Sequence, residues 1–375
     1  MAHVLCEFGI IFATNLTYFS ILKKNISVFV VFIAFVFSLS AQKTYKVAAV
    51  GFYNVENLFD TINDPNRLDE EFLPDGEKKY TNKIFREKIE QLSSVISKLA
   101  TETTPDGVAL LGVCEVENRW VLEELARHPS LVSRNYQIEH YDSPYNRGVD
   151  VALMYNPRYF IVTESEPLAV ALKDKKGELL NPTRDVLYVK GLLLGEETHV
   201  FVNHWPSRRG GEEASAHLRQ QAARVVRNKI DQIYAEDDDA HIIVMGDLND
   251  DPNNISVAEV LNAGGKIGKL KEGQLYNPFY NLYRQGIGSL AWNDSWNLFD
   301  QIIISKSLLK DTDEDDDDDD DKPLFFKRAE VYNRPHLTQK SGNFKGYPWR
   351  TYIGNEYAGG YSDHFPTIVY LYKLK

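Results

Sequence analysis

Carboxylate, amide and imidazole side chains stand at the ends of several apolar, strand-like runs of this 375-residue chain. The residues in these positions are Asn54, Glu115, His204, Asp247, Asn249, Asp363 and His364. Ligand sites of layered α/β proteins are commonly built where buried strands end at one edge of a sheet. A buried carboxylate is costly unless it is paired or holds a metal. Because the set is rich in oxygen and contains no thiolate pair, it favours a hard cation such as Mg²⁺ or Mn²⁺.

Each of these motifs also has an ordinary structural explanation. Asn54 and Asp247 can lie in simple turns, and Glu115 can be an acid at a helix N-terminus. His204, beside a tryptophan and a proline, can be a packed core histidine, and His364 can belong to a capped turn. Turns alone explain the combination in one chain poorly, so we interpret the motifs as parts of one active site.

Apolar periodicity predicts the elements that must position these side chains. A helix is expected from about Asn82 to Ala100, where apolar residues recur at intervals of three and four, with Thr81 as its N-cap. A second helix is expected from about Ser215 to Tyr234. Short apolar runs predict strands at 46–53, 107–114, 149–155, 185–194, 198–203, 241–246, 299–304 and 366–372. Many strands with few helices between them favour packed sheets flanked by helices in one domain.

The composition bounds the class of protein. A formal net charge of −12 at pH 7 argues against a protein that coats nucleic acid by charge alone. It does not exclude an enzyme that meets phosphate through a local basic site or a bound cation. The two cysteines, Cys6 and Cys114, provide neither a disulfide framework nor a CxxC-type metal site.

The N-terminal segment has the pattern of a secretory signal peptide. Lys23 and Lys24 precede an apolar run from Ile26 to Leu39, and small residues up to Ala41 precede a polar stretch. We therefore expect a signal peptide at 1–41, a mature catalytic domain at 42–375, and export to the periplasm or the medium. The alternative is a retained membrane anchor at 26–40, although the run is short for a span of about 20 residues.

An uninterrupted acidic block occupies residues 313–321. Like charges repel, so we expect a solvated, disordered insertion at 311–322 between two elements. A calcium-binding tract is the alternative.

The motifs together resemble those of the endonuclease/exonuclease/phosphatase superfamily, which includes deoxyribonuclease I. They occur in the family's order over about residues 45–373, and Gly-Asp-x-Asn and Ser-Asp-His are the most specific among them. They are Asn54-Val55-Glu56-Asn57, Glu115-Val116-Glu117-Asn118, Asn203-His204-Trp205-Pro206-Ser207, Gly246-Asp247-Leu248-Asn249, Asp300-Gln301-Ile302 and Ser362-Asp363-His364. The resemblance implies an α/β four-layered sandwich, in which helices flank two packed, mainly antiparallel sheets.

The resemblance also implies roles for single residues. Glu115 would be the main ligand of Mg²⁺, with Mn²⁺ or Ca²⁺ as alternatives, and Asn54 and Asp363 would lie nearby. Asp247 and Asn249 would orient or deprotonate the attacking water. His364 would pair with Asp300, His204 would contact the scissile phosphate, and Arg147 would reach phosphate unless it is a surface arginine. Either Asp247 or His364 can take the water proton, and we favour Asp247.

The substrate class follows less directly from the residues. Trp205 and Arg208, near Gly210 and Gly211, can meet a stacked base and phosphates, or can belong to a solvated loop. We expect an exported nuclease or phosphodiesterase that acts on nucleic acid rather than lipid, as a monomer without a stable protein partner. The alternatives are a sphingomyelinase-like lipid phosphodiesterase and a non-catalytic ligand-binding member of the same fold.

Overall fold

Buried apolar runs form the strands at the centre of the computed structural model, which describes residues 44–292, 294–309 and 323–374. Residues Tyr45–Leu374 form one compact unit. The expected signal peptide at 1–41, the alternative anchor at 26–40 and the acidic insertion at 311–322 lie outside the described residues.

The first large sheet has the strand order β14-β17-β1-β2-β4-β3. Neighbouring strands are antiparallel except β1 and β2, which are parallel. In sheet order these strands cover Phe325–Val331, Thr367–Leu374, Tyr45–Leu58, Val108–Val116, Asp150–Tyr155 and Gln137–His140.

The second large sheet has the strand order β5-β6-β7-β8-β13-β10-β9. Its parallel pairs are β7 with β8 and β9 with β10. In sheet order the strands cover Phe160–Leu168, Val186–Leu193, Glu196–His204, His241–Asp247, Asp300–Ile304, Leu275–Tyr276 and Ala263–Gly264. Two small hairpins join β11 (Leu290–Trp292) with β12 (Ser295–Asn297), and β15 (Tyr352–Ile353) with β16 (Glu356–Tyr357).

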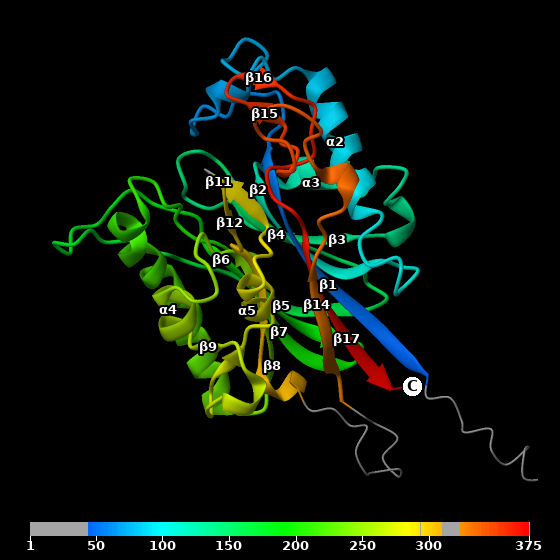
Figure 1. The fold of residues 1–375 in the computed structure, drawn as a ribbon, viewed down its shortest axis with the longest axis vertical. Helices are drawn as coiled ribbons and strands as arrows, with labels where there is room; N and C mark the ends of the chain where they lie inside the picture. The colour runs from blue at the N-terminus through cyan, green and yellow to red at the C-terminus, as the bar shows by residue number, and fades with distance from the viewer. Residues whose placement is uncertain (1–43, 293, 310–322, 375) are drawn as a thin grey trace, which may run out of the picture. The chain divides into compact units, whose positions relative to one another are not determined.

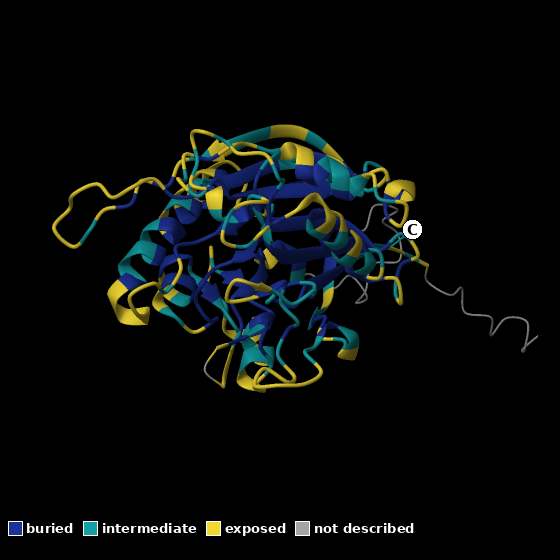
Figure 2. Cartoon of the chain, turned by 90° about the horizontal axis from the view of Figure 1, so that it is seen from above, coloured by how far each residue is buried: buried dark blue, intermediate teal, exposed yellow. Residues whose placement is uncertain are grey.

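The two large sheets pack face to face over the main hydrophobic core. Figure 2 shows these strands as buried, beneath a more exposed layer of helices and loops. The sheets approach closely where Gly112 of β2 faces Met245 of β8, because a Cβ at Gly112 would lie 2.4 Å from the methionine Sδ. The expected sandwich of two packed, mainly antiparallel sheets is confirmed.

Helices cover the outer faces of the sheets (Figure 1). α2 (Asn82–Ile96) packs against β1, and its N-cap Thr81 accepts a hydrogen bond from the backbone N–H of Ile84. The sequence placed this helix correctly, although it ends at Ile96 rather than Ala100.

α4 (Glu212–Glu236) contains the second predicted helix and is longer at both ends. Its buried Ala222, Val226 and Ile230 pack on the second sheet in a separate apolar cluster. Burying an aliphatic side chain of this size contributes about 1.5–3 kcal/mol. The shorter helices are α3 (Arg119–Ala126) and α5 (Phe279–Arg284). None of the helices in the described part of the chain has the length and apolar character needed to cross a bilayer.

Candidate active site

Strand register brings three predicted site residues side by side in the second sheet. β7 and β8 are parallel, so they end at the same edge, where His204 pairs in register with Asp247. β13 is antiparallel to β8 and begins at that edge, where Asp300 pairs with Asp247. An imidazole and two carboxylates therefore come from neighbouring positions at one edge of the sheet.

The first sheet presents a matching set at its facing edge. β1 and β2 are parallel, with Asn54 in register with Cys114 just before Glu115. β17 is antiparallel to β1, so His364, which precedes β17, also lies at this edge. The sets meet at Asn54, whose Nδ2 donates hydrogen bonds to Glu115 Oε1 and Asp247 Oδ2, each at 3.1 Å. Glu115 and Asp247, 132 residues apart by their numbers (247 − 115), thus share one amide group.

Glu115 reaches this position through an irregularity of β2. Its φ is +63°, in the left-handed region, and the pairing of β2 with β4 shifts register between Cys114 and Val116. A non-glycine residue in this region costs about 1–3 kcal/mol. The backbone N–H of Asn57 donates to Glu115 Oε2 at 3.0 Å and fixes the turned-out carboxylate.

His364 and Asp300 form a buried pair. His364 Nδ1 lies 2.6 Å from Asp300 Oδ2, which also accepts a hydrogen bond from Ser289 Oγ at 2.5 Å. Burial alone lowers the pKa of His364, but the carboxylates of Asp300 and Asp247 raise this pKa well above its usual value. His364 is therefore a cationic imidazolium, and its Nε2 lies 4.0 Å from Asp247 Oδ2.

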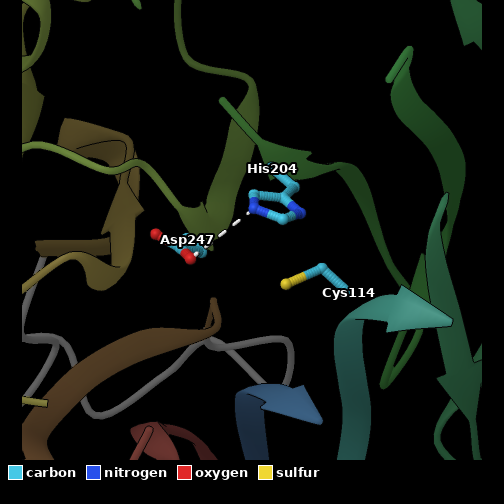
Figure 3. Close-up of side chains that lie close together, drawn as sticks. All are labelled: Cys114, His204 and Asp247. Carbon is cyan, nitrogen blue, oxygen red and sulfur yellow. Dashed lines mark ion pairs between the residues drawn. The ribbon is translucent and has the colours of Figure 1, made fainter. Parts of the chain in front are cut away.

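His204 differs from His364 in the direction of its pKa shift. Burial, helped by the charges of Arg184 and His364, lowers its pKa well below the usual value, so the ring is neutral. Its Nε2 lies 3.7 Å from Asp247 Oδ2 and 3.9 Å from Glu115 Oε1. Figure 3 shows the ring facing the Asp247 carboxylate, with the Cys114 thiol below both. Burial and nearby carboxylates raise the pKa of this thiol, which excludes a thiolate nucleophile.

Asp247 is placed to accept a proton. Burial raises its pKa to about 7, with His364 opposing the rise and Asp300 adding to it. The backbone N–H of Asn249 donates to Asp247 Oδ1 at 3.0 Å. Asn249 has a φ of +49°, and its Nδ2 donates to the carbonyl of Trp205 at 3.0 Å. Asn249 thus holds the turn that carries Asp247 against the end of β7.

The side chains at this edge fit a divalent cation. Glu115 Oε1 and Asp247 Oδ2 both face the Nδ2 of Asn54, and the cationic His364 lies 4.0 Å from Asp247 Oδ2. An oxygen-rich, negatively charged set of this kind suits Mg²⁺ or Mn²⁺. Asp363 instead pairs with Arg350 at 3.1 Å, while its other oxygen lies 4.0 Å from His364 Nε2.

Arg147 lies next to this edge. Its Nη2 donates to Asn57 Oδ1 at 3.0 Å, and its side chain remains 41% exposed, with Glu71 at 3.6 Å. A substrate phosphate approaching Glu115 would therefore find a partly free guanidinium beside it.

The prediction that Trp205 stacks on a substrate base is wrong. It is 1% exposed and belongs to the apolar cluster beneath α4, and its Nε1 donates to Asn203 Oδ1 at 3.0 Å. Its ring therefore has no face available to a substrate.

The prediction that Arg208 contacts substrate phosphates is also wrong. Its guanidinium stacks on Phe299 at 4.5 Å and is held by acceptors from the turn after Asp247 and from α4. Its hydrogen-bond acceptors are Asn249, Asp250, Asp251, Asn254 and Glu212. Arg208 therefore links the turn that follows Asp247 with the start of α4.

We expect Arg208→Gln to destabilise the fold by about 1–3 kcal/mol, because buried carboxylates lose their partner. The kcat should fall with little change in KM. Urea unfolding and steady-state kinetics measure the two effects. The neighbouring Arg209, which is exposed, provides the matched control Arg209→Gln. A raised KM at an unchanged urea midpoint in Arg208→Gln would contradict the structural role.

The sequence motifs missed a buried arginine at this edge. Arg184, 7% exposed, donates Nη2 to the Trp205 carbonyl at 2.8 Å and stacks on Tyr145 at 4.7 Å. Its Nε has no hydrogen-bond partner, and its charge contributes to the low pKa of His204. Because Arg184 directly precedes a predicted strand, the strand-end pattern used for the other residues could have found it.

The sequence motifs also missed the contacts of Glu56, near the end of β1, with a segment close to the C-terminus. Glu56, whose φ is +50°, accepts hydrogen bonds from the backbone N–H groups of Thr351 and Tyr352. Burial and Asp363 raise the pKa of Glu56 to about 7, although the buried Lys88 opposes this rise. These contacts fix the segment that carries Arg350, the partner of Asp363. No periodic pattern in the sequence indicates them.

The fold and site define the class of protein. The profile of the Endonuclease/Exonuclease/phosphatase family matches residues 49–373, and the chain belongs to this family. Its members are phosphoesterase hydrolases and typically depend on a divalent metal.

Solved structures with the same fold are distant in sequence. An endonuclease/exonuclease/phosphatase family protein from Bacteroides thetaiotaomicron is 15% identical, with a TM-score of 0.52, over 88% of this chain and 96% of that one. TDP2 from D. rerio, complexed with single-strand DNA product, is 16% identical, with a TM-score of 0.51, over 87% and 99%. A mannosyl-6-phosphatase from B. thetaiotaomicron is 15% identical, with a TM-score of 0.50, over 86% and 99%. A comparison with curated protein sequences gave no match.

Proposed function

We propose that this chain is a divalent-metal-dependent phosphoesterase that hydrolyses a phosphate ester by attack of water. The observation that carries this proposal is the meeting of both sheet edges at Asn54, whose amide joins Glu115 to Asp247. The Asp300–His364 pair stands beside them. A non-catalytic member of the fold would have no need to keep this set together, so the binding-module alternative is disfavoured.

The protonation states of Asp247, His204 and His364 suggest a different catalytic role for each residue. Asp247, with a pKa raised to about 7, accepts the proton of the attacking water near neutral pH. The neutral His204 donates a hydrogen bond to a non-bridging oxygen, and the cationic His364, held by Asp300, stabilises the charge that develops on the phosphoryl group. A divalent cation held by the Glu115 carboxylate would polarise the phosphoryl group. Asn54, whose Nδ2 donates to Glu115 and whose Oδ1 accepts from the Glu56 backbone N–H, orients that carboxylate.

A phosphodiester of nucleic acid or a nucleotide is the substrate class we propose. Arg147 and Arg350 supply positive charge near the site, with side chains 41% and 31% exposed. Trp296 stacks on Phe365, the residue after His364, and is 38% exposed. An exposed aromatic ring next to a catalytic group offers a stacking surface to a nucleobase. The DNA product bound to the D. rerio TDP2 supports the same substrate class.

A phosphomonoester is the competing substrate, because the mannosyl-6-phosphatase has the same fold. We further propose export, which rests on the signal-peptide pattern of residues 1–41. An exported enzyme would scavenge phosphate esters outside the cytoplasm.

A substrate panel tests the proposal. The purified protein should hydrolyse bis(p-nitrophenyl) phosphate or DNA in the presence of Mg²⁺ or Mn²⁺, and EDTA should abolish the activity. p-Nitrophenyl phosphate, a sugar 6-phosphate and sphingomyelin separate the competing substrate classes. Asp247→Ala is the negative control. Equal activity in EDTA, or in Asp247→Ala, would refute the metal-dependent site.

A further inference from the structure

An acidic cavity lies where the segments after β1 and β2 meet the connection between β3 and β4. It encloses about 230 Å³, and the acids that line it are Asp60, Asp64, Glu117, Asp142 and Asp150. Arg67 is the one basic residue of its lining, and it donates to the Tyr145 carbonyl. The catalytic candidates Asn54, Glu115, His204, Asp247, Asp300 and His364 are not among the residues that line this cavity. Its negative charge is therefore poorly compensated by the protein, but acidity alone does not make it a site.

A buried histidine provides the second observation. The side chain of His140 is 3% exposed, and its Nε2 has no hydrogen-bond partner. This nitrogen lies 3.5 Å from Oδ2 of the buried Asp150, too far for a good hydrogen bond. His140 Nδ1 lies 3.9 Å from Oδ1 of Asp142, so the ring stands between two carboxylates that line the cavity.

The remaining contacts of Asp150 leave one oxygen for a ligand. Oδ1 accepts hydrogen bonds from the backbone N–H and the hydroxyl of Ser143. Oδ2 is the atom that faces His140. One ligand atom each from His140, Asp142 and Asp150 lie within 4.8 Å of one another.

The 3.5 Å between His140 Nε2 and Asp150 Oδ2 suits two ligands of one metal ion better than a direct hydrogen bond. Ligand atoms about 2.1 Å from a metal lie roughly 3.0–3.5 Å apart at tetrahedral or octahedral angles. The distance between His140 Nε2 and Asp150 Oδ2 falls at the upper end of that range. Asp142 lies nearest the opposite ring nitrogen, and its 73% exposed side chain would turn toward Nε2 to complete the site. An imidazole combined with carboxylates suits Mn²⁺ or Zn²⁺ better than Mg²⁺ or Ca²⁺.

We propose that His140, Asp142 and Asp150 bind a divalent transition cation, Mn²⁺ or Zn²⁺, at a second metal site distinct from the one at Glu115. His140 ends β3 and Asp150 begins β4, so the ion would close the connection between these strands. This connection carries Arg147, which contacts Asn57 at the active-site edge. The second ion would therefore hold Arg147 in place and offset the charge of the acidic cavity.

Metal binding itself tests the proposal without reference to activity. The protein, stripped with EDTA, is titrated with Mn²⁺ under electron paramagnetic resonance as wild type, Glu115→Gln, His140→Ala and the double variant. Glu115→Gln should retain the second ion, whereas His140→Ala should bind one ion fewer, or bind that ion at least about tenfold more weakly, than wild type. A Zn²⁺ titration by calorimetry should give the same ranking.

The control is His128→Ala, because His128 also lies beside an acid, Glu90, but on the surface and away from the cavity. It should bind as wild type does. Asp142→Asn provides a second probe that spares the core, since Asp142 is 73% exposed. In the Glu115→Gln background, Mn²⁺ at about 100 times its Kd should raise the Tm by about 4 °C, and His140→Ala should abolish this rise. Unchanged stoichiometry and affinity for both metals in His140→Ala and Asp142→Asn would overturn the proposal.

Discussion

Asp247→Asn is expected to lower kcat by at least about 10³-fold and to leave the fold intact, because it removes the proposed proton acceptor while keeping its size and most of its contacts. Asparagine can still accept the hydrogen bond from the backbone N–H of Asn249. Its amide cannot take a proton from water near neutral pH. Steady-state kinetics on bis(p-nitrophenyl) phosphate at saturating Mg²⁺ measures the effect.

Stability measurements separate this loss from unfolding. Burial raises the folded-state pKa of Asp247 to about 7, well above the roughly 4 of an unfolded aspartate. The stability that its protonated form contributes is present below about pH 4 and is lost as the pH rises through about 7. At pH 8 in EDTA, Asp247→Asn should therefore be at least as stable as wild type in urea.

Glu259→Gln is the matched control, because Glu259 is an exposed acid in the segment that follows β8. It should retain wild-type kcat. An Asp247→Asn variant that keeps more than about a tenth of the wild-type kcat would rule out Asp247 as the base.

The sequence predicted the site's assembly because its residues border deeply buried strands. β1, β2, β7, β8, β13 and β17 are central strands, and their apolar runs are long enough to be recognised without a structure. Once these strands are placed, parallel and antiparallel pairing brings the residues at their ends to one edge. The meeting of Asn54, Glu115 and Asp247 follows from that pairing.

Most strands of the two large sheets that the sequence did not predict lie at the sheet edges, and β10, which lies between β13 and β9, is only two residues long. β14 and β3 border the first sheet, and β5 and β9 border the second. An edge strand exposes part of its surface, so its sequence is mixed: β5 reads Phe-Ile-Val-Thr-Glu-Ser-Glu-Pro-Leu, and most of it is at least partly exposed. The apolar signal is then too weak to separate such a strand from a loop.

Two features of the site depend on the folded backbone and leave no local signal. Glu115 and Asn249 adopt left-handed conformations, which only the surrounding contacts can impose on them. Trp205 and Arg208 follow β7 in a polar, glycine-containing stretch that looks like a surface loop. Their partners, however, come from α4 and from the turn after β8, more than forty residues further along for Asn249 and Asp250.

Asp300→Asn is expected to lower kcat by about 10³-fold and to move the alkaline limb of the pH profile to lower pH. Asp300 is the main group that raises the pKa of His364 against the effect of burial. Without its negative charge, burial dominates and the imidazolium loses its proton at a lower pH. The values of kcat/KM between about pH 5 and 9.5 measure the shift, and NMR of the ring nitrogens reports the His364 pKa directly.

Ser289→Ala separates this charge effect from a packing effect. Ser289 Oγ donates to the same oxygen, Asp300 Oδ2, that contacts His364, so its loss disturbs the same buried contact without removing the carboxylate. We expect a loss of less than about tenfold and an alkaline limb within about half a pH unit of wild type. If Ser289→Ala and Asp300→Asn moved the limb equally, packing around His364 would explain the effect. An unchanged limb in Asp300→Asn would mean that the reaction does not depend on the charge of His364, and its proposed role in stabilising the phosphoryl group would be wrong.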